Sequence, residues 1–268
     1  MKPGSLARRL AARIIRSIPI VRRQFLTSTD YRVLSGPDEA RRTSTTSNGW
    51  FAARTVQRQE RAYLNLIEAM KRGAPRLDFA VAAAAVEETK LATPTVLEVG
   101  CGSGYYSEIF ARLLPGKLRY SGVDYSEAMI ARARARYQSV AFEVADATQL
   151  PYPNDSFDIV FNGVSLLHIL AYQDAIREAA RVASRFCILH TVPVHQHRTT
   201  FLTKYAYGAP VVEIIFEKRE LIELCENAGL TLVREWSCIP YDLREITGHH
   251  STTETYLFSK RSAPTAAP

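Results

Sequence analysis

A strand that runs into three closely spaced glycines constrains the fold of this chain more than any other feature. Residues 95–105 read Thr-Val-Leu-Glu-Val-Gly-Cys-Gly-Ser-Gly-Tyr, so Gly100, Gly102 and Gly104 follow an apolar, β-branched run. Such runs are typical of buried parallel strands, and glycine permits a sharp turn and a close approach to a ligand. A helix predicted over 105–114 would direct free N–H groups at that ligand. The sequence therefore predicts an α/β domain with a binding site beyond its first strand.

Two acidic residues at the ends of the next predicted strands support this site. Asp124 closes the strand-like run 118–123, twenty residues after Gly104, where a carboxylate can accept hydrogen bonds from both hydroxyls of a ribose. Asp146 follows the predicted strand 140–144, where it can accept from an adenine amino group. The alternative role for Asp146 is to cap a turn before the next residues of the chain.

A third stretch supplies a resemblance to a known family. Residues 150–161, Leu-Pro-Tyr-Pro-Asn-Asp-Ser-Phe-Asp-Ile-Val-Phe, closely resemble the turn and fourth strand of the type 11 class I methyltransferases, and the glycine loop resembles that family's first motif. The resemblance covers 95–189, with four motifs in order. It implies a Rossmann-like α/β fold, with six parallel strands and one antiparallel strand, and S-adenosyl-L-methionine as cofactor. One departure is that 181–190 lacks the family's Pro-Gly-Gly turn, which leaves the geometry there open.

The glycine spacing disfavours the rival class of NAD-dependent dehydrogenases. Their fingerprint is GxGxxG, but the sixth position counted from Gly100 is Tyr105. The resemblance implies instead that the glycines pass the methionine part of the cofactor, while Asp124 takes the ribose and Asp146 meets the adenine. The cofactor residues so implied are Glu98, Gly100, Cys101, Gly102, Gly104, Asp124, Tyr125, Met129, Asp146, Ala147, Asn162 and Gly163.

The methyl acceptor is expected outside the carboxyl ends of the fourth and fifth strands, where ligands of such sheets bind. A hydroxyl acceptor needs a base, and imidazole suits that task near neutral pH. His168 is the first candidate base and His190 the second; the alternative for His168 is to pack under the adenine side or to cap the next helix. Acceptor contacts are predicted from His195, His197, Tyr205 and Tyr207, within an aromatic insertion over 193–216 that could also be a lid.

No metal site is predicted. His195 and His197 could be combined with His249 and His250, but no carboxylate stands at ligand spacing beside either pair. The four cysteines form no CxxC pair, which fits a reducing cytoplasm. No apolar run approaches the ~20 residues that cross a bilayer.

Charge divides the chain into an N-terminal part and the rest. The formal net charge is +7, yet residues 1–58 hold twelve Lys or Arg against three acidic residues, so the remainder is slightly acidic. Residues 6–18 predict a helix with an apolar half-turn opposite Arg8, Arg9, Arg13 and Arg16. Such a helix could lie on an anionic membrane surface, form a cleaved transit peptide, or pack on a protein domain. A peripheral position at the inner face of the membrane follows from the first reading.

Four segments are expected. Residues 1–48 form a basic arm and linker, 49–93 a helical cap over the sheet and cofactor mouth, 94–261 the catalytic domain, and 262–268 a disordered tail. The expected activity is O-methylation of a small molecule or a sugar or glycan acceptor. An RNA or protein methyltransferase tethered by the arm is disfavoured because Asn162 begins Asn-Gly-Val-Ser, not an Asn-Pro-Pro-Tyr-like motif; nucleic acid is therefore not an expected partner. A non-catalytic cofactor-binding protein is disfavoured because every cofactor motif is intact.

Overall fold

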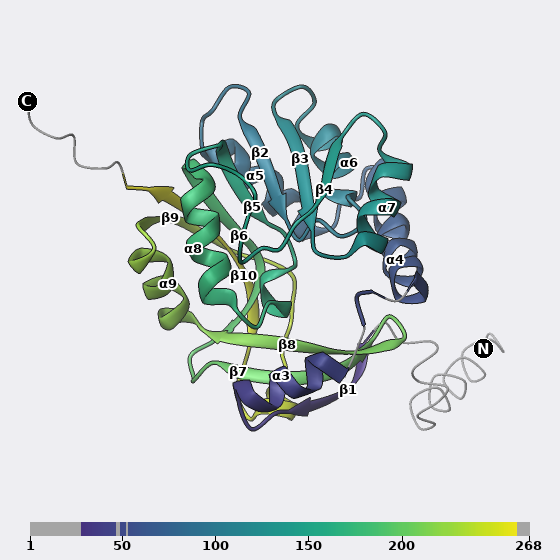
Figure 1. Ribbon diagram of the computed structural model, residues 1–268, viewed down its shortest axis with the longest axis vertical. Helices are drawn as coiled ribbons and strands as arrows, with labels where there is room; N and C mark the ends of the chain where they lie inside the picture. The colour runs from purple at the N-terminus through teal and green to yellow at the C-terminus, as the bar shows by residue number, and fades with distance from the viewer. Residues whose placement is uncertain (1–27, 47–48, 52, 262–268) are drawn as a thin grey trace, which may run out of the picture.

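The computed structural model describes residues 28–46, 49–51 and 53–261, and its centre is a twisted sheet (Figure 1). Seven of its strands run in the order β4-β3-β2-β5-β6-β10-β9. Six are mutually parallel, and β10 is antiparallel to both of its neighbours. The predicted class I arrangement is confirmed. The bounds are β2 Thr95–Val99, β3 Arg119–Asp124, β4 Ala141–Val144, β5 Phe157–Asn162, β6 Ala183–His195, β9 Leu230–Ser237 and β10 Thr252–Lys260.

Helices cover both faces of this sheet because the central strands direct apolar side chains to both faces. On β2, Leu97 and Val99 belong to one buried cluster and Val96 to the other. The first cluster packs under α8 (Tyr172–Val182) and α9 (Lys218–Asn227). The second packs under α4 (Ala53–Lys71), α5 (Leu77–Glu88) and α6 (Tyr105–Leu113), while α7 (Glu127–Arg136) covers the β3–β4 edge. Within the described ranges, none of the helices has the length and apolar character needed to traverse a lipid bilayer.

The connection into β6 needs no glycine. Helix α8 ends at Val182 and β6 begins at the next residue, Ala183. Arg181 holds this corner, because its guanidinium donates to the carbonyl oxygens of Tyr152 at 2.7 Å and Leu150 at 3.0 Å. A side chain thus stabilises the connection whose geometry the sequence left open.

Two segments correct the sequence-based expectations. Part of the expected linker forms β1 (Ser28–Val33) and α3 (Pro37–Thr46), and most of the expected insertion forms β7 (Thr200–Ala206) and β8 (Ala209–Glu217). These three strands are antiparallel, and β8 joins the end of β6, which makes a ten-stranded sheet. The linker prediction failed because β1 depends on pairing with β7, about 170 residues away, which no local pattern records.

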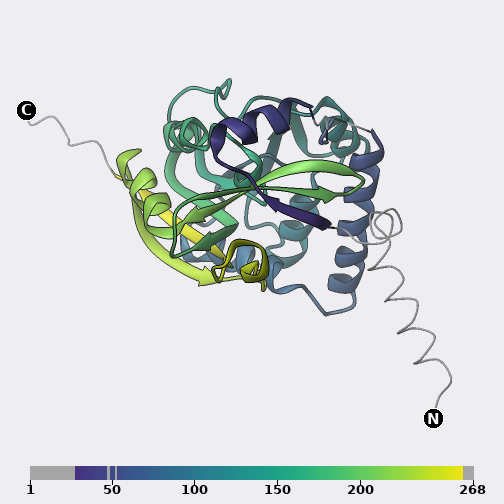
Figure 2. The same ribbon diagram turned by 90° about the horizontal axis from the view of Figure 1, so that it is seen from below.

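The added strands form a second layer across one end of the main sheet (Figures 1 and 2). Helix α3 packs on this layer through Ala40, which is fully buried and belongs to the same buried cluster as Phe201 of β7. The remaining short helices are η1 (Leu166–His168) and α10 (Arg244–Thr247). The predicted amphipathic segment 6–18 and the predicted tail 262–268 lie outside the described residues.

Candidate active site

The glycine loop after β2 is tied to the neighbouring strand. The amide N–H groups of Gly100 and Cys101 both donate to the carbonyl oxygen of Val123, at 2.8 and 2.9 Å. Gly102 has a φ of +54°, in the left-handed region that other residues avoid. A Cβ there would lie 3.3 Å from Nε2 of Gln59 and 3.9 Å from Sδ of Met129. The loop therefore presents bare backbone towards the cap helix α4 and the start of α7.

Asp124 stands at the end of β3 with its carboxylate fixed. Its Oδ2 accepts from the Gly102 amide at 2.9 Å, and its Oδ1 accepts from the Ser126 amide at 2.9 Å. Burial raises the pKa of this carboxyl, while the two backbone donors oppose the rise. Each oxygen keeps further lone-pair capacity, so the carboxylate can accept from a ligand without losing its place.

A first cavity of about 280 Å³ lies along this loop. Asp146 lines this cavity, where an adenine contact was considered for it. Its Oδ1 also accepts from the amide and hydroxyl of Thr148, so the residue caps the turn there as well. Carboxylates at Asp124 and Asp146 with apolar walls between them fit a ribose and an adenine. The predicted cofactor residues that line this cavity are Gly100, Gly102, Asp124, Tyr125, Met129, Asp146 and Ala147.

Five predicted cofactor residues do not line the cavity and instead support it. Asn162 accepts from the Leu166 amide at 2.9 Å and fixes the turn into η1. Glu98 is 1% exposed and accepts from the Tyr120 hydroxyl, and burial raises its pKa to about 8. Gly163 is required because a Cβ there would lie 2.5 Å from Oε1 of Glu98. The other two are Cys101 and Gly104, which pack against Gly122 and Phe142.

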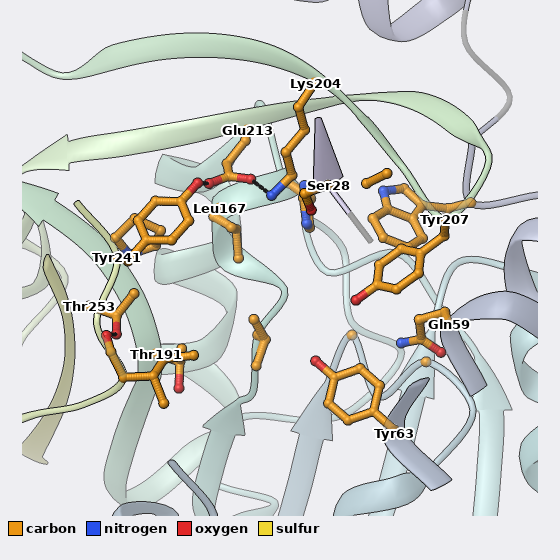
Figure 3. Close-up of a pocket in the computed structure, with 18 of the residues that line it drawn as sticks. Ser28, Gln59, Tyr63, Leu167, Thr191, Lys204, Tyr207, Glu213, Tyr241 and Thr253 are labelled. Atoms are coloured by element: carbon orange, nitrogen blue, oxygen red, sulfur yellow. Dashed lines mark hydrogen bonds and ion pairs between the residues drawn. The ribbon is translucent and has the colours of Figure 1, made fainter. Parts of the chain in front are cut away.

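A second cavity of about 160 Å³ adjoins the first (Figure 3). The walls of both include Trp50, Gln59, Gly100, Gly102, Val164 and His168. The far wall of the second cavity belongs to the added layer, with Lys204 of β7 and Glu213 of β8, and to Tyr241. Tyr207, from the β7–β8 turn, points its hydroxyl towards Gln59 and Tyr63. Residues from both ends of the chain therefore meet over the glycine loop.

A buried ion pair stands in that far wall. The Lys204 ammonium contacts Oε2 of Glu213, and the Tyr241 hydroxyl donates to Oε1 of the same carboxylate. Glu213 is fully buried, and the Lys204 side chain is 11% exposed. Lys204 holds the pKa of Glu213 below its usual range against the effect of burial, and Glu213 holds that of Lys204 above its usual range. Both groups are therefore charged at neutral pH.

His168 is the one predicted base that lines a cavity, and it borders both. Its Nδ1 lies 2.7 Å from the carbonyl oxygen of Val212, so Nδ1 carries the proton and Nε2 keeps a free lone pair. The Trp50 ring packs against the imidazole at 4.9 Å between centroids. Burial lowers the pKa of His168 to about 4, so the ring is neutral at neutral pH.

His190 does not belong to the site. It is fully buried, and its ring nitrogens contact the hydroxyls of Thr255 at 2.8 Å and Thr191 at 2.9 Å. Phe161 stacks on the ring at 5.5 Å. The prediction of His190 as a base is therefore corrected, because strand β6 continues to His195 and its position 190 faces the core.

Three of the four predicted acceptor contacts also lie away from the cavities. His195 is buried with Nε2 against the Arg198 carbonyl oxygen, and the exposed His197 stacks on His249 at 3.9 Å. The Tyr205 hydroxyl donates to the carbonyl oxygen of Gly208, which leaves Tyr207 as the predicted contact that lines the second cavity. Among the described residues, no cluster of His, Cys, Asp or Glu has the arrangement of a metal site.

The cap contributes contacts that the motifs did not name. Trp50 is anchored because the Ser126 hydroxyl donates to its carbonyl oxygen at 2.9 Å, and Gln59 accepts from the Ser103 hydroxyl at 3.4 Å. Tyr63 stacks on Tyr105 at 3.7 Å. These three residues of the segment 49–71 line the cavities beside the glycine loop, and the helical apolar pattern of that segment was the signal that pointed to it.

Residues 96–185 match the family described as "Methyltransferase domain". A probable S-adenosylmethionine-dependent methyltransferase of Mycolicibacterium smegmatis is 37% identical over 87 residues, which are 32% of this chain and 33% of that protein. The 27-O-demethylrifamycin SV methyltransferase of Amycolatopsis mediterranei is 38% identical over 93 residues, 32% of this chain and 34% of that protein. The chain thus spans about a third of the length of these relatives.

The fold comparison reaches further than the sequence match. A structure of a Methanosarcina mazei SAM-dependent methyltransferase superposes with a TM-score of 0.54 over 66% of this chain and 97% of that one, at 15% identity. That likeness establishes a shared fold. The motifs, the sheet order and the matched segment together identify residues 96–185 as a methyltransferase domain of the class I, type 11 kind.

Proposed function

We propose that this protein transfers a methyl group from S-adenosylmethionine to a hydroxyl oxygen of a small molecule. One observation carries the proposal: a cavity lined by the family's cofactor motifs shares a wall with a second cavity, and His168 stands in that wall with Nε2 free. When bound, the cofactor supplies a methyl group on a positively charged sulfur. The hydroxyl to be methylated would then lie in the second cavity.

The residues of the first cavity would bind and orient the cofactor. Asp124 would accept from the ribose hydroxyls, and Asp146 from the adenine amino group, with Ala147, Ile169 and Leu170 as apolar walls. The bare backbone at Gly102 would allow the methionine part to pass close to the loop. These roles align the donor with the second cavity, and alignment is the main contribution of such an enzyme.

His168 would remove the proton of the acceptor hydroxyl. Its Nδ1–H is committed to Val212, so the proton can go only to Nε2. Burial lowers the pKa of His168. Of the two charges across the cavity, the Glu213 carboxylate would favour the imidazolium so formed, and the Lys204 ammonium would oppose it. The base is thus neutral before the reaction.

Product analysis tests this function. The protein would be incubated with methyl-labelled S-adenosylmethionine and a small-molecule extract, and labelled products would be assigned by mass and by the atom that bears the methyl group. An O-methyl product supports the proposal, and an N- or C-methyl product contradicts it. Calorimetric titration with S-adenosylhomocysteine comes first, since failure to bind would exclude every cofactor-dependent activity.

Three alternatives differ in the acceptor or in the chemistry. A terminal sugar of a glycan would be labelled in the carbohydrate fraction of the same extract. An RNA or protein methyltransferase would label macromolecules in that extract. A non-catalytic binding protein would bind S-adenosylhomocysteine and label nothing.

We propose separately that the basic arm binds anionic membrane surfaces, on the charge pattern of residues 6–18. Each arginine near such a surface contributes about 1 kcal/mol, and this attraction falls off over roughly a Debye length of 8–10 Å. The intact protein should sediment with anionic vesicles and be partly released by salt. Deletion of residues 1–23 should abolish sedimentation and leave cofactor affinity unchanged. Loss of cofactor binding in the truncated protein, without vesicle binding by the intact one, would refute the membrane proposal.

A further inference from the structure

We propose that the second cavity selects an uncharged, oxygen-bearing single ring, and that the Lys204 ammonium donates a hydrogen bond to one of its oxygens. The inference rests on the proposed function, since it names the class of acceptor that His168 would deprotonate. It is carried by three features of the cavity: the free donors of Lys204, the charge balance of the far wall, and the aromatic side chains around it (Figure 3).

Lys204 has more donors than partners. Its ammonium carries three N–H groups, and the acceptor that the structure gives it among residues 28–46, 49–51 and 53–261 is Oε2 of Glu213. Its other near neighbours are the rings of Tyr31 and Tyr241, whose centroids lie 5.5 and 5.9 Å from Nζ. A buried donor without an acceptor is costly, so the remaining N–H groups favour a ligand oxygen in the cavity.

Charge balance favours a neutral ligand over an anionic one. Lys204 and Glu213 are the charged residues among those that line this cavity, and each neutralises the other. A carboxylate or phosphate on the ligand would place a second anion near Glu213 with no second cation in the lining. The cost of burying an uncompensated charge exceeds that of burying a hydroxyl or carbonyl oxygen, which Lys204 can satisfy.

The size and the walls of the cavity favour one ring. About 160 Å³ is close to the ~150 Å³ of an engineered apolar cavity that accepts benzene. Trp50 and Tyr207 stand 6.0 Å apart between ring centroids and are tilted by 51°, so a ligand ring can pack on either face but cannot be sandwiched between them. Thr191 and Thr253 add hydroxyls on another side. A phenolic ring and a sugar ring share this chemistry.

The test measures binding to protein saturated with S-adenosylhomocysteine, by calorimetry, with three probes of one ring each. Resorcinol and methyl β-glucopyranoside are the neutral probes, aromatic and saturated, and 3-hydroxybenzoate is the anionic partner of resorcinol. We expect at least one neutral probe to bind about 10-fold more tightly than 3-hydroxybenzoate. The neutral probe that binds better identifies the ring type. Preference for 3-hydroxybenzoate, or binding of neither neutral probe, would overturn the proposal.

Variants connect the preference to Lys204. Lys204→Met should lower the affinity for the neutral probe about 10-fold and leave the affinity for S-adenosylhomocysteine unchanged. Because that change leaves Glu213 buried without a cation, the double variant Lys204→Met with Glu213→Gln provides a neutral wall that still accepts from Tyr241. Lys117→Met, which removes an exposed lysine paired with Glu87, is the matched control. Unchanged probe affinity in the folded double variant would refute the role of Lys204.

Failure of this proposal can be distinguished from failure of the proposed methyl transfer. If the protein binds no S-adenosylhomocysteine, the methyl-transfer proposal fails, and the same probes titrated into the free protein still report the selectivity of the cavity. If it binds S-adenosylhomocysteine but neither neutral ring, the acceptor class proposed here is wrong while methyl transfer to another acceptor stays open.

Discussion

The two cavities share a wall, yet the chain builds them in different ways. Most residues of the first cavity come from the segment 100–170, where each short motif follows the end of one parallel strand. The second cavity takes its walls from positions as distant as Ser28 and Thr253, brought together by β1, β7, β8 and the approach to β10. The residues that line the first cavity therefore come mainly from local motifs, and those that line the second are brought together by long-range pairing.

This difference has a physical origin. Parallel strands place all their carboxyl ends at one edge of the sheet, so the strand topology alone brings the residues after each strand together there. The added layer instead depends on register between remote segments, such as Ser28 opposite Ala206. Substitutions of residues that line the first cavity alone should thus act on cofactor affinity, and those of residues that line the second cavity alone on the acceptor.

The largest expected effect is loss of cofactor binding in Gly102→Val. The residue has a φ of +54° and faces Gln59 and Met129, so a β-branched side chain would be strained and would enter the space beside the loop. Gly116→Val is the matched control, because Gly116 has a φ of +70° with open space around the position of a Cβ. Titration with S-adenosylhomocysteine, with circular dichroism for folding, should show binding by the control alone. Native affinity in Gly102→Val would place the ligand elsewhere.

His168→Gln tests whether the shared wall separates the two tasks. The variant keeps a donor for the Val212 carbonyl but loses the basic Nε2, so the methylation rate should fall by about 100-fold or more at unchanged cofactor affinity. Because burial lowers the pKa of His168 to about 4, the wild-type rate should remain high on acidification through pH 6.5 and fall only near pH 4. His197→Gln, at an exposed histidine outside both cavities, should behave as wild type. A rate loss explained by weaker cofactor binding would contradict the assignment.

Asp124→Asn should act in the opposite way, on the cofactor alone. The amide retains the shape of the carboxylate but loses its charge, and hydrogen bonds to charged groups contribute roughly 1.5–3 kcal/mol, so affinity should fall about 10-fold or more. Asp155→Asn, at an exposed aspartate that pairs with Lys260, controls for a lost surface charge. Calorimetry provides the measurement. Unchanged affinity in the folded variant would refute the role of Asp124 but not the fold.

The same contrast explains which expectations the structure bears out. The helix expected over 105–114 is α6, and the strand expected over 118–123 is β3. These follow from periodicity and motifs that act over short distances. Strand β1 and the ion pair of Lys204 with Glu213 could not be predicted from local sequence patterns, because each needs a partner whose position only the folded chain defines. His190 was misjudged since nothing in the sequence showed that β6 continues past it.

The smallest expected effect concerns His190, which lies in the core and lines neither cavity. Burial lowers its pKa from 6.5 to about 3, so the unfolded chain binds a proton at this residue at a higher pH than the folded protein does. The stability contributed by neutral His190 is complete above pH 6.5 and is lost as the pH falls towards 3. At pH 5 the loss is about 2 kcal/mol, because each pKa unit is equivalent to ~1.4 kcal/mol.

Thermal unfolding between pH 7 and pH 5 measures this loss of stability, with His190→Gln compared with the exposed His197→Gln. The first variant lowers stability at every pH, since it disturbs contacts with Thr191 and Thr255, but its loss of stability on acidification should be about 2 kcal/mol smaller than in wild type. The His197→Gln slope should match wild type, because this side chain is exposed and lies outside the core. Equal slopes in all three proteins would mean that His190 accepts a proton within the fold, and would return it to the candidates for a base.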